Sequence, residues 1–290
     1  MKYTYYPGCS VKATANLYQD SIDAVAPLLG LELEELEDWN CCGATAYMSV
    51  KELMSFAISS RNLALAEPLH RDLVTPCSAC YTVLKKTNTY LAAYPELRQK
   101  VGKALEVAGL SYSGNVKVRH LFNVVIDDVG IEKISSMVQR NLEGLRVACY
   151  YGCQIARPET DLDHPDNPKS MEALVIALGA TASYFPMKTH CCGASLMGTE
   201  EELALRLCKN LLLNAERNNA DVIVTVCPLC QMNLDVYQGK VNKLFGTNFH
   251  IPVIYFTQLI GAAMGLPFKK LGLHKVAMKI KGEPKRILNG

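Results

Sequence analysis

The feature that most constrains the fold of this chain is a set of cysteines that occurs twice in the same order. In the first quintet, Cys9 is followed after 31 residues by Cys41-Cys42 and after 34 more by Cys77-x-x-Cys80. In the second quintet, Cys153 is followed after 37 residues by Cys191-Cys192 and after 34 more by Cys227-x-x-Cys230. Two matching orders predict a duplicated chain in which each half brings five thiols together.

The residues around the cysteines support the duplication. Tyr6-Pro7-Gly8-Cys9 matches Tyr150-Tyr151-Gly152-Cys153, and Cys41-Cys42-Gly43-Ala44 matches Cys191-Cys192-Gly193-Ala194. The six-residue difference lies in the first gap, where residues 157–168 are rich in Pro and Asp and indicate an inserted loop. We therefore expect an N-terminal domain over residues 1–144 and a C-terminal domain over residues 145–290, joined near Gly144.

Short apolar runs and helical periodicity alternate along both halves and predict an α/β fold. We expect strands at 2–6, 72–75, 145–150 and 221–226, helices at 15–29, 49–66, 200–217 and 230–243, and strand–helix units at 118–130 and 253–265. This alternation predicts two pseudo-symmetric halves of parallel strands with flanking helices. The cysteines then lie at the carboxyl ends of the strands, where open α/β sheets bind their ligands.

Composition narrows the function classes. The first residues lack the apolar stretch of a secretion signal, and no run of eighteen apolar residues occurs, so we expect a cytoplasmic chain without a membrane span. Twelve cysteines in such a chain indicate metal ligands or redox groups rather than disulfides. The net charge of +2 argues against a nucleic-acid partner. The two remaining cysteines, Cys149 and Cys208, match Tyr5 and Ile58 in the repeat and are expected to be ordinary buried thiols.

Five gathered thiolates need cations among them, because a buried anion without a counterion is very costly. Structural zinc is tetrahedral and takes four ligands, so a fifth thiolate has no place on it. The Cys-x-x-Cys-x-x-Cys run of many cubane sites is absent from the sequence. A Cys-Cys pair suits a larger or distorted iron–sulfur cluster, and Gly43 and Gly193 would let the backbone pass close to inorganic sulfide. Zinc, or a dithiol site at Cys77/Cys80 or Cys227/Cys230, remains an alternative.

The two quintets resemble the motif of the CCG-domain family, and the resemblance covers nearly the whole chain. Two such domains without a fused cubane domain are similar to the B subunits of heterodisulfide reductases from methanogenic archaea. Other relatives of the domain take part in glycolate and lactate oxidation, thiol:fumarate reduction and some succinate dehydrogenases. The motif is therefore specific for the domain and less specific for the substrate.

The resemblance implies two noncubane [4Fe-4S] clusters, each held by one quintet. The implied substrate is the mixed disulfide of coenzyme M and coenzyme B, reduced to two thiols between the clusters. The implied partners are the cubane iron–sulfur subunit of heterodisulfide reductase and its flavin subunit, with a hydrogenase or formate dehydrogenase reached through the flavin subunit. The alternatives are an electron-transfer subunit of a hydroxyacid- or fumarate-linked oxidoreductase and a zinc-held scaffold protein.

Charged residues near the cysteines are candidates for binding substrate anions. Lys188 and His190 precede Cys191, where the first half has Asp38 and Asn40. We predict that Lys188 and His190 act at the catalytic site, in anion binding or, for His190, in proton delivery to a leaving thiolate. Lys12 and Arg157 follow the first cysteine of each quintet and are similar candidates. Solvated loop charges are the alternative for each of them.

Two further features have two interpretations each. Residues 269–290 carry six lysines and Arg286 against Glu283, which indicates a solvated tail or a docking segment for an acidic partner. Trp39, beside the first Cys-Cys pair, is expected to shield the first cluster or to fill the core.

Overall fold

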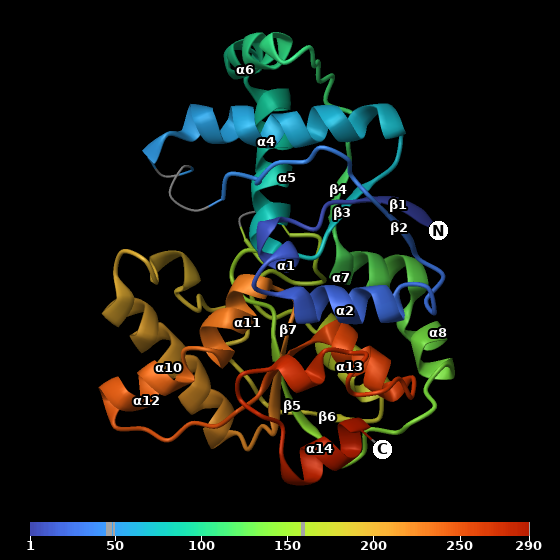
Figure 1. Cartoon of the computed structure of the whole chain (residues 1–290), viewed down its shortest axis with the longest axis vertical. Coiled ribbons are helices and arrows are strands. Elements are labelled where there is room, and N and C mark those ends of the chain that lie inside the picture. The colour runs from blue at the N-terminus through green and yellow to red at the C-terminus, as the bar shows by residue number, and fades with distance from the viewer. Residues whose placement is uncertain (45–47, 49, 158–159, 290) are drawn as a thin grey trace.

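The computed structural model describes residues 1–44, 48, 50–157 and 160–289. It places two four-stranded parallel sheets in the chain, one in each half (Figure 1). The first sheet contains β1 (Lys2–Tyr5), β2 (Glu32–Glu35), β3 (Leu73–Thr75) and β4 (Val118–His120). The second contains β5 (Arg146–Tyr150), β6 (Thr181–Ala182), β7 (Val222–Thr225) and β8 (Val253–Tyr255). The predicted α/β fold with two similar halves is confirmed.

Helices flank both sheets. The first half has α1 (Cys9–Lys12), α2 (Asn16–Val25), α4 (Glu52–Ala66), α5 (Ser78–Ala93), α6 (Pro95–Val107), α7 (Leu121–Val124) and α8 (Ile131–Ser136), with a 3-10 turn η1 (Glu67–Leu69) and a π-helical turn η2 (Val125–Val129). The second half has α9 (Ser170–Ala177), α10 (Glu201–Arg217), α11 (Pro228–Asp235), α12 (Gln238–Phe245), α13 (Phe256–Ala263) and α14 (Gly282–Asn289), with 3-10 turns η3 (Ala194–Leu196) and η4 (Leu273–Lys275).

Both sheets have the same strand order, β2-β1-β3-β4 and β6-β5-β7-β8, and every pairing is parallel. The central strand β7 is buried along its whole length, as its Val-Ile-Val-Thr sequence leads one to expect for a sheet covered on both faces. The edge strands β2 and β6 were not predicted. β2 is Glu-Leu-Glu-Glu and largely exposed, so it lacks the apolar pattern that identifies a strand.

Three predicted helices differ from the structure by more than one residue at an end or in continuity. The helix expected at 15–29 is α2, which ends at Val25. The helix expected at 49–66 is α4, which begins at Glu52, and Ser49 lies outside the described residues. The helix expected at 230–243 is divided into α11 and α12 by a turn at Val236 and Tyr237. The expected loop at 157–168 contains neither helix nor strand at residues 157 and 160–168, and Pro158 and Glu159 lie outside the described residues.

The two halves meet along a buried seam that includes α2 of the first half and α13 of the second (Figure 1). The Tyr18 ring stacks on Tyr255 with a centroid distance of 3.7 Å and an interplanar angle of 3°. The buried hydroxyls of Ser21 and Thr257 lie 2.6 Å apart and share a hydrogen bond. Aromatic packing and a satisfied polar pair thus fix the two sheets relative to each other. The domain boundary at residue 144 stays a prediction.

The basic C-terminal segment packs onto the protein, which corrects the expectation of a solvated tail. Leu271, Leu273, Val276, Ile280 and Leu288 are buried. The Lys275 ammonium lies 2.6 Å from the Asp20 carboxylate of the first half. The segment therefore contributes apolar surface to the core and fastens the two halves together. Among the described residues, no helix is both long and apolar enough to cross a bilayer.

Candidate metal centres and the cavity between the halves

Each quintet lies at the carboxyl end of its sheet, as expected. The first cysteine of each quintet follows the inner strand β1 or β5, and the Cys-x-x-Cys pair follows β3 or β7. Cys77 and Cys227 precede the first residues of α5 and α11, and Cys80 and Cys230 lie in the first turns of these helices. The Cys-Cys pairs lie in loops without helix or strand. Parallel strands end at one edge of a sheet, so five distant cysteines come together there.

A buried tyrosine holds each Cys-Cys loop against its sheet. The Tyr6 hydroxyl donates to the backbone carbonyl of Asn40 at 2.7 Å, and the Tyr150 hydroxyl donates to that of His190 at 2.7 Å. Burial, with the nearby cysteine sulfurs adding to it, raises the pKa of both phenols, so both remain donors. Trp39 packs edge-on against Tyr6 at 5.4 Å, beside the first quintet, and its role as a shield stays a prediction.

The structure brings the five sulfurs of each quintet into one neighbourhood. The Sγ atoms of Cys9 and Cys41 lie 3.9 Å apart, and those of Cys192 and Cys230 lie 3.5 Å apart. Hydrogen bonds between thiols also join Cys42 to Cys41 and to Cys80, and Cys191 to Cys153. In the described ranges, no three Cys, His, Asp or Glu side chains are already arranged to hold a metal ion.

The two quintets meet at the seam between the halves. The thiols of Cys77 and Cys227 hydrogen-bond to each other, and each also bonds to the second cysteine of its own Cys-x-x-Cys pair. Both side chains are buried. Exposure differs within each quintet, because the Cys9 and Cys41 side chains are exposed, Cys191 is exposed and Cys153 is half-buried. Each quintet thus has a buried side at the seam and an open side toward solvent.

The thiols share protons instead of ionising together. Hydrogen bonds from Cys42 and Cys9 lower the pKa of Cys41 to about 2, while the hydrogen bond with Cys41 raises the pKa of Cys42 to about 12. Donation by Cys153 lowers the pKa of Cys191 to about 6, and the pKa of Cys153 rises. Within each quintet, a lowered pKa of one thiol thus goes with a raised pKa of its hydrogen-bonded neighbour. Ionising all five thiols of a quintet together would require cations among them.

The donor set fits an iron–sulfur cluster. All five ligand candidates in each quintet are soft sulfur atoms, which favour iron–sulfur clusters, zinc and copper over magnesium or calcium. Five exceed the four that tetrahedral zinc takes. Gly43 and Gly193, expected to allow close approach to sulfide, have φ near +80° and lie against α4 and α10, where a Cβ would come within 3.2 Å of Ser55 Oγ or 2.8 Å of Ala204 Cα. The positive φ favours glycine at both positions, and at Gly193 a Cβ would also clash with the backbone of α10.

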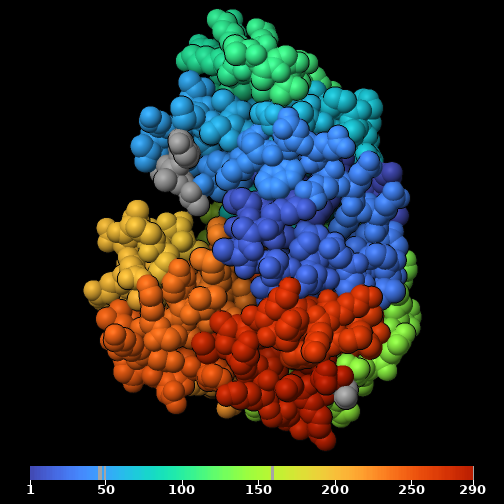
Figure 2. All heavy atoms as spheres, viewed as in Figure 1, coloured from blue at the N-terminus to red at the C-terminus, as the bar shows by residue number. Residues whose placement is uncertain are grey.

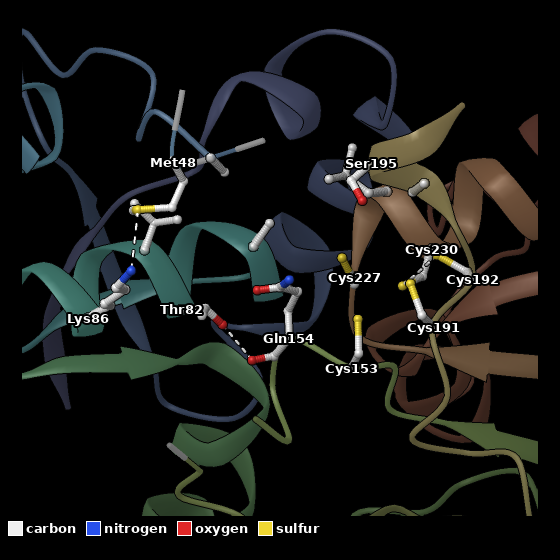
Figure 3. A pocket seen from close by; sticks show the side chains of 15 residues that line it. Met48, Thr82, Lys86, Cys153, Gln154, Cys191, Cys192, Ser195, Cys227 and Cys230 are labelled. Atoms are coloured by element: carbon white, nitrogen blue, oxygen red, sulfur yellow. Dashed lines mark hydrogen bonds between the residues drawn. The ribbon is translucent and has the colours of Figure 1, made fainter. Parts of the chain in front are cut away.

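A cavity of about 250 Å³ lies beside the second quintet, between the two halves (Figure 3). All five cysteines of the second quintet line one side, and Met48, Thr82 and Lys86 of the first half line the other. Gln154, next to Cys153, lies between them and accepts a hydrogen bond from Thr82 Oγ1 through its backbone carbonyl. In the space-filling view, the surface is notched between the first half and the gold part of the second half (Figure 2).

A wider, more open cavity of about 900 Å³ adjoins the solvent side of the second quintet. Cys153 and Cys191 line both cavities, so the second quintet lies where the two meet. His190 is exposed and lines the open cavity together with Arg157. The Arg157 guanidinium donates to the carbonyl and hydroxyl of Thr189, both at 3.2 Å, which holds it at this wall. Lys12, the corresponding candidate in the first half, pairs with Glu35 at 2.5 Å.

Lys188 has a different position from the one its sequence neighbours suggest. Its side chain is 5% exposed, and its ammonium lies 2.7 Å from a carboxylate oxygen of Glu172. The ammonium also donates to the backbone carbonyl of Pro168. Tyr151 donates to the other Glu172 oxygen at 2.6 Å. Because this cation is buried and already paired, we do not retain Lys188 as an anion-binding residue.

The first-half wall of the cavity was not predicted from the sequence. Ala79, Thr82, Val83 and Lys86 line the cavity from α5. Their spacing of three and four residues places them on one helix face, directly after Cys77. This spacing is visible in the sequence, but it indicates a cavity wall only when the position of the other half is known.

The two extra cysteines, Cys149 and Cys208, are fully buried, as expected. The Cys208 thiol lies 3.2 Å from the carbonyl of Cys192.

Several known proteins are similar to this chain over most of its length. The chain is 36% identical to the 8-methylmenaquinol:fumarate reductase membrane anchor subunit of Wolinella succinogenes, over 94% of this chain and 95% of that protein. It is 34% identical to a heterodisulfide reductase B-subunit-like protein of Archaeoglobus profundus, over 93% of each. It is 31% identical to the B-subunit of the ferredoxin:CoB-CoM heterodisulfide reductase of Methanosarcina mazei, over 94% of this chain and 90% of that protein.

A solved structure shares the fold, and a family description matches both halves. A hypothetical protein from Helicobacter pylori superimposes with a TM-score of 0.77 at 16% identity, over 97% of this chain and 52% of that one, so this chain spans about half of its length. The cysteine-rich CCG domain matches residues 3–85 and 147–235, the parts that contain both quintets. The resemblance inferred from the cysteines is confirmed, and the chain belongs to the CCG cysteine-rich domain family.

Proposed function

We propose that this chain is the catalytic subunit of a heterodisulfide reductase, with two noncubane [4Fe-4S] clusters, one on each quintet. The substrate is the mixed disulfide of coenzyme M and coenzyme B, which is reduced to two thiols. One observation carries the proposal: a cavity of about 250 Å³ between the halves is lined by all five cysteines of the second quintet. The full-length similarity to heterodisulfide reductase B subunits supports it.

The reaction breaks one S–S bond and consumes two electrons and two protons, giving two thiols. When bound, the clusters would supply the electrons and a Lewis-acidic metal for the sulfur atoms. The chain's own residues bind and orient the disulfide. Val83 and Leu229 give the cavity apolar walls, and the Lys86 ammonium, which pairs with Glu52 at 2.8 Å, is a cation for an acidic group of the substrate.

The open cavity is the proposed site for a second acidic arm of the substrate. Arg157 is fixed there by Thr189, so its guanidinium is placed to pair with a sulfonate, phosphate or carboxylate. His190 lines the same wall beside Cys191 and is the proposed proton donor to the leaving thiolate. We place neither role on Lys188, because its side chain is only 5% exposed and its ammonium is buried between Glu172 and the Pro168 carbonyl. The Lys86 side chain, by contrast, is 23% exposed at the cavity.

The chain acts within a complex in this proposal. Relatives along its whole length are named as subunits of larger enzymes. We propose a cytoplasmic assembly in which a cubane iron–sulfur subunit delivers electrons to this chain and a flavin subunit generates them. A hydrogenase or formate dehydrogenase would supply the flavin subunit.

A second candidate function is electron transfer in a fumarate-linked oxidoreductase. It is favoured by the 36% identity to the membrane anchor subunit of the Wolinella enzyme. In that role the quintets would hold electron-relay centres, and the cavity would take no disulfide. The two candidates therefore differ in whether a small disulfide reacts directly with this chain.

The test is to add the coenzyme M–coenzyme B disulfide to anaerobically purified, reduced protein and record its visible and EPR spectra. We expect the disulfide to reoxidise the metal centres, because its sulfurs reach the second quintet through the cavity. Fumarate, added in a parallel sample, should leave the spectra unchanged. Unchanged spectra with the disulfide would contradict the catalytic role and favour the relay.

A further inference from the structure

The inserted loop at residues 157–168 contains a residue that binds the first half. Asp161 lies within the inserted loop, and its carboxylate accepts a hydrogen bond from the Tyr81 hydroxyl at 2.6 Å. Its other oxygen lies 2.6 Å from the Lys85 ammonium. The backbone carbonyl of Asp161 also accepts a hydrogen bond from the Asn123 side chain at 2.9 Å. Three first-half residues therefore bind one residue of the insertion.

Asp161 binds α5, the helix that lines the first-half side of the cavity. Tyr81 and Lys85 lie on α5, one helical turn apart, and Lys85 also donates to the Tyr81 hydroxyl at 3.0 Å. The same helix lines the cavity through Thr82 and Lys86. Thr82 donates to the carbonyl of Gln154, directly after Cys153. The second half thus holds α5 at two points, beside Cys153 and at Asp161.

Opposite charges meet at the contact between Asp161 and Lys85. Burial alone would raise the pKa of Asp161, but hydrogen bonds from Lys85 and Tyr81 outweigh burial and lower it. Asp161 is therefore ionised at neutral pH, opposite a Lys85 side chain that is only 22% exposed. Such a charge-assisted pair gives direction as well as attraction, which suits a contact that fixes the position of a helix.

The contact exists on one side of the pseudo-symmetric molecule. Lys85 matches Asp235 in the 150-residue repeat, and Asp235 binds the backbone N–H groups of Ala277 and Met278 in the C-terminal segment instead. The cavity likewise adjoins the cysteines of the second quintet. The insertion, its contact with α5 and the cavity thus all lie on the side of the second quintet.

We propose that Asp161 is a positioning residue that holds α5 over the second quintet and so sets the width of the substrate cavity. The proposal deepens, and rests on, the assignment of this cavity as the disulfide site. Loosening the contact moves the part of α5 that lines the cavity, while the cysteines of the second quintet, which lie on the other half, stay in place. KM should therefore rise more than kcat falls.

The test compares Asp161→Ala with Asp163→Asn in the assembled, metal-loaded protein. Asp163 belongs to the same insertion, but its carboxylate binds Lys169 N–H at 2.7 Å and the Ser170 hydroxyl at 3.0 Å within the second half. We expect Asp161→Ala to raise KM for the heterodisulfide about tenfold with kcat within about twofold, at unchanged iron content. Asp163→Asn should leave both constants unchanged. The exchanged pair Asp161→Lys with Lys85→Asp should recover most of the lost affinity.

Amide hydrogen exchange of residues 78–86 gives a readout that does not depend on the reaction. We expect exchange about tenfold faster in Asp161→Ala and in Lys85→Met, and no change in Asp163→Asn. Unchanged exchange and unchanged KM in both variants would overturn the positioning role. If the unsubstituted protein fails to reduce the disulfide but the exchange result holds, the proposed function fails while the contact stands. If Asp161→Ala does not fold, Lys85→Met decides by the same two measurements.

Discussion

At two positions next to the cysteines, the absence of a side chain leaves room for a cysteine sulfur. Gly8 and Gly152 precede the first cysteine of each quintet and have φ of +74° and +75°. A Cβ on Gly8 would lie 2.9 Å from Cys80 Sγ, and one on Gly152 would lie 3.1 Å from Cys230 Sγ. A side chain at either position would meet backbone strain of roughly 1–2 kcal/mol and push against a proposed ligand.

We therefore expect Gly8→Ala to remove about half of the bound iron, because one of two cluster sites is lost. Gly102→Ala is the matched control, since Gly102 lies within α6 with no heavy atom within 4 Å of its added Cβ. Iron and sulfide analysis of both variants checks the expectation. Full iron content in Gly8→Ala would show that the sulfur of Cys80 can shift without loss of the cluster.

At the scale of residues, the cysteine quintets were predictable from the sequence, but the residues that surround them were not. Repetition identified the quintets because ligand order survives any detail of folding. The positions of Lys188 and Lys86 depend on packing that no local pattern contains. Lys188 is three residues before Cys191 in sequence yet pairs with Glu172, whereas Lys86 of the first half lines the cavity beside the second quintet. His190 and Arg157 do lie at the open cavity, and their roles stay predictions.

α5 and α11 are equivalent helices of the two halves, but they bind different segments of the chain. α5 uses Lys85 to bind the inserted loop, and α11 uses Asp235 to bind the C-terminal segment. Asp235 is fully buried, and burial raises its pKa to about 6 although backbone N–H groups of Ala277, Val253 and Met278 lower it. The folded protein therefore keeps a proton on this carboxyl at pH values where the unfolded chain has released it.

A raised carboxyl pKa predicts a definite sign for the pH dependence of stability. The contribution of protonated Asp235 is complete below the unfolded pKa of about 3.9 and is lost as pH rises through about 6. We expect the free energy of unfolding of the unsubstituted protein, relative to Asp235→Asn, to fall by about 1 kcal/mol between pH 5 and pH 7. Denaturant unfolding at the two pH values measures it. A constant or rising difference would show that Asp235 is already ionised at pH 5.

At the scale of elements, buried strands were predictable and edge strands were not. β7 is apolar because both faces of its sheet are covered, so its sequence identifies it. β2 pairs on one side and keeps three glutamates in solvent, where ion pairs with Lys2 at 3.0 and 3.3 Å replace apolar contacts. The C-terminal segment was misjudged for a related reason. Its lysines dominate the composition, while the leucines that bury it are few and widely spaced.

The whole molecule is a duplicated fold with one-sided differences. Both sheets have the same strand order, and the two quintets meet through Cys77 and Cys227. The insertion and the cavity break this symmetry on the side of the second quintet. A pseudo-symmetric pair of centres with one shaped cavity suits a substrate whose two sulfur-bearing halves differ. The duplication was predictable from sequence, but the side on which the cavity opens required the structure.

In the proposed function, iron and inorganic sulfide hold the ten cysteine sulfurs in two clusters. The iron and acid-labile sulfide content of the anaerobically purified protein measures whether they do. Two four-iron clusters predict about eight irons and about eight sulfides per chain. Zinc at one or two ions per chain, with no acid-labile sulfide, would show that the quintets hold no iron–sulfur cluster.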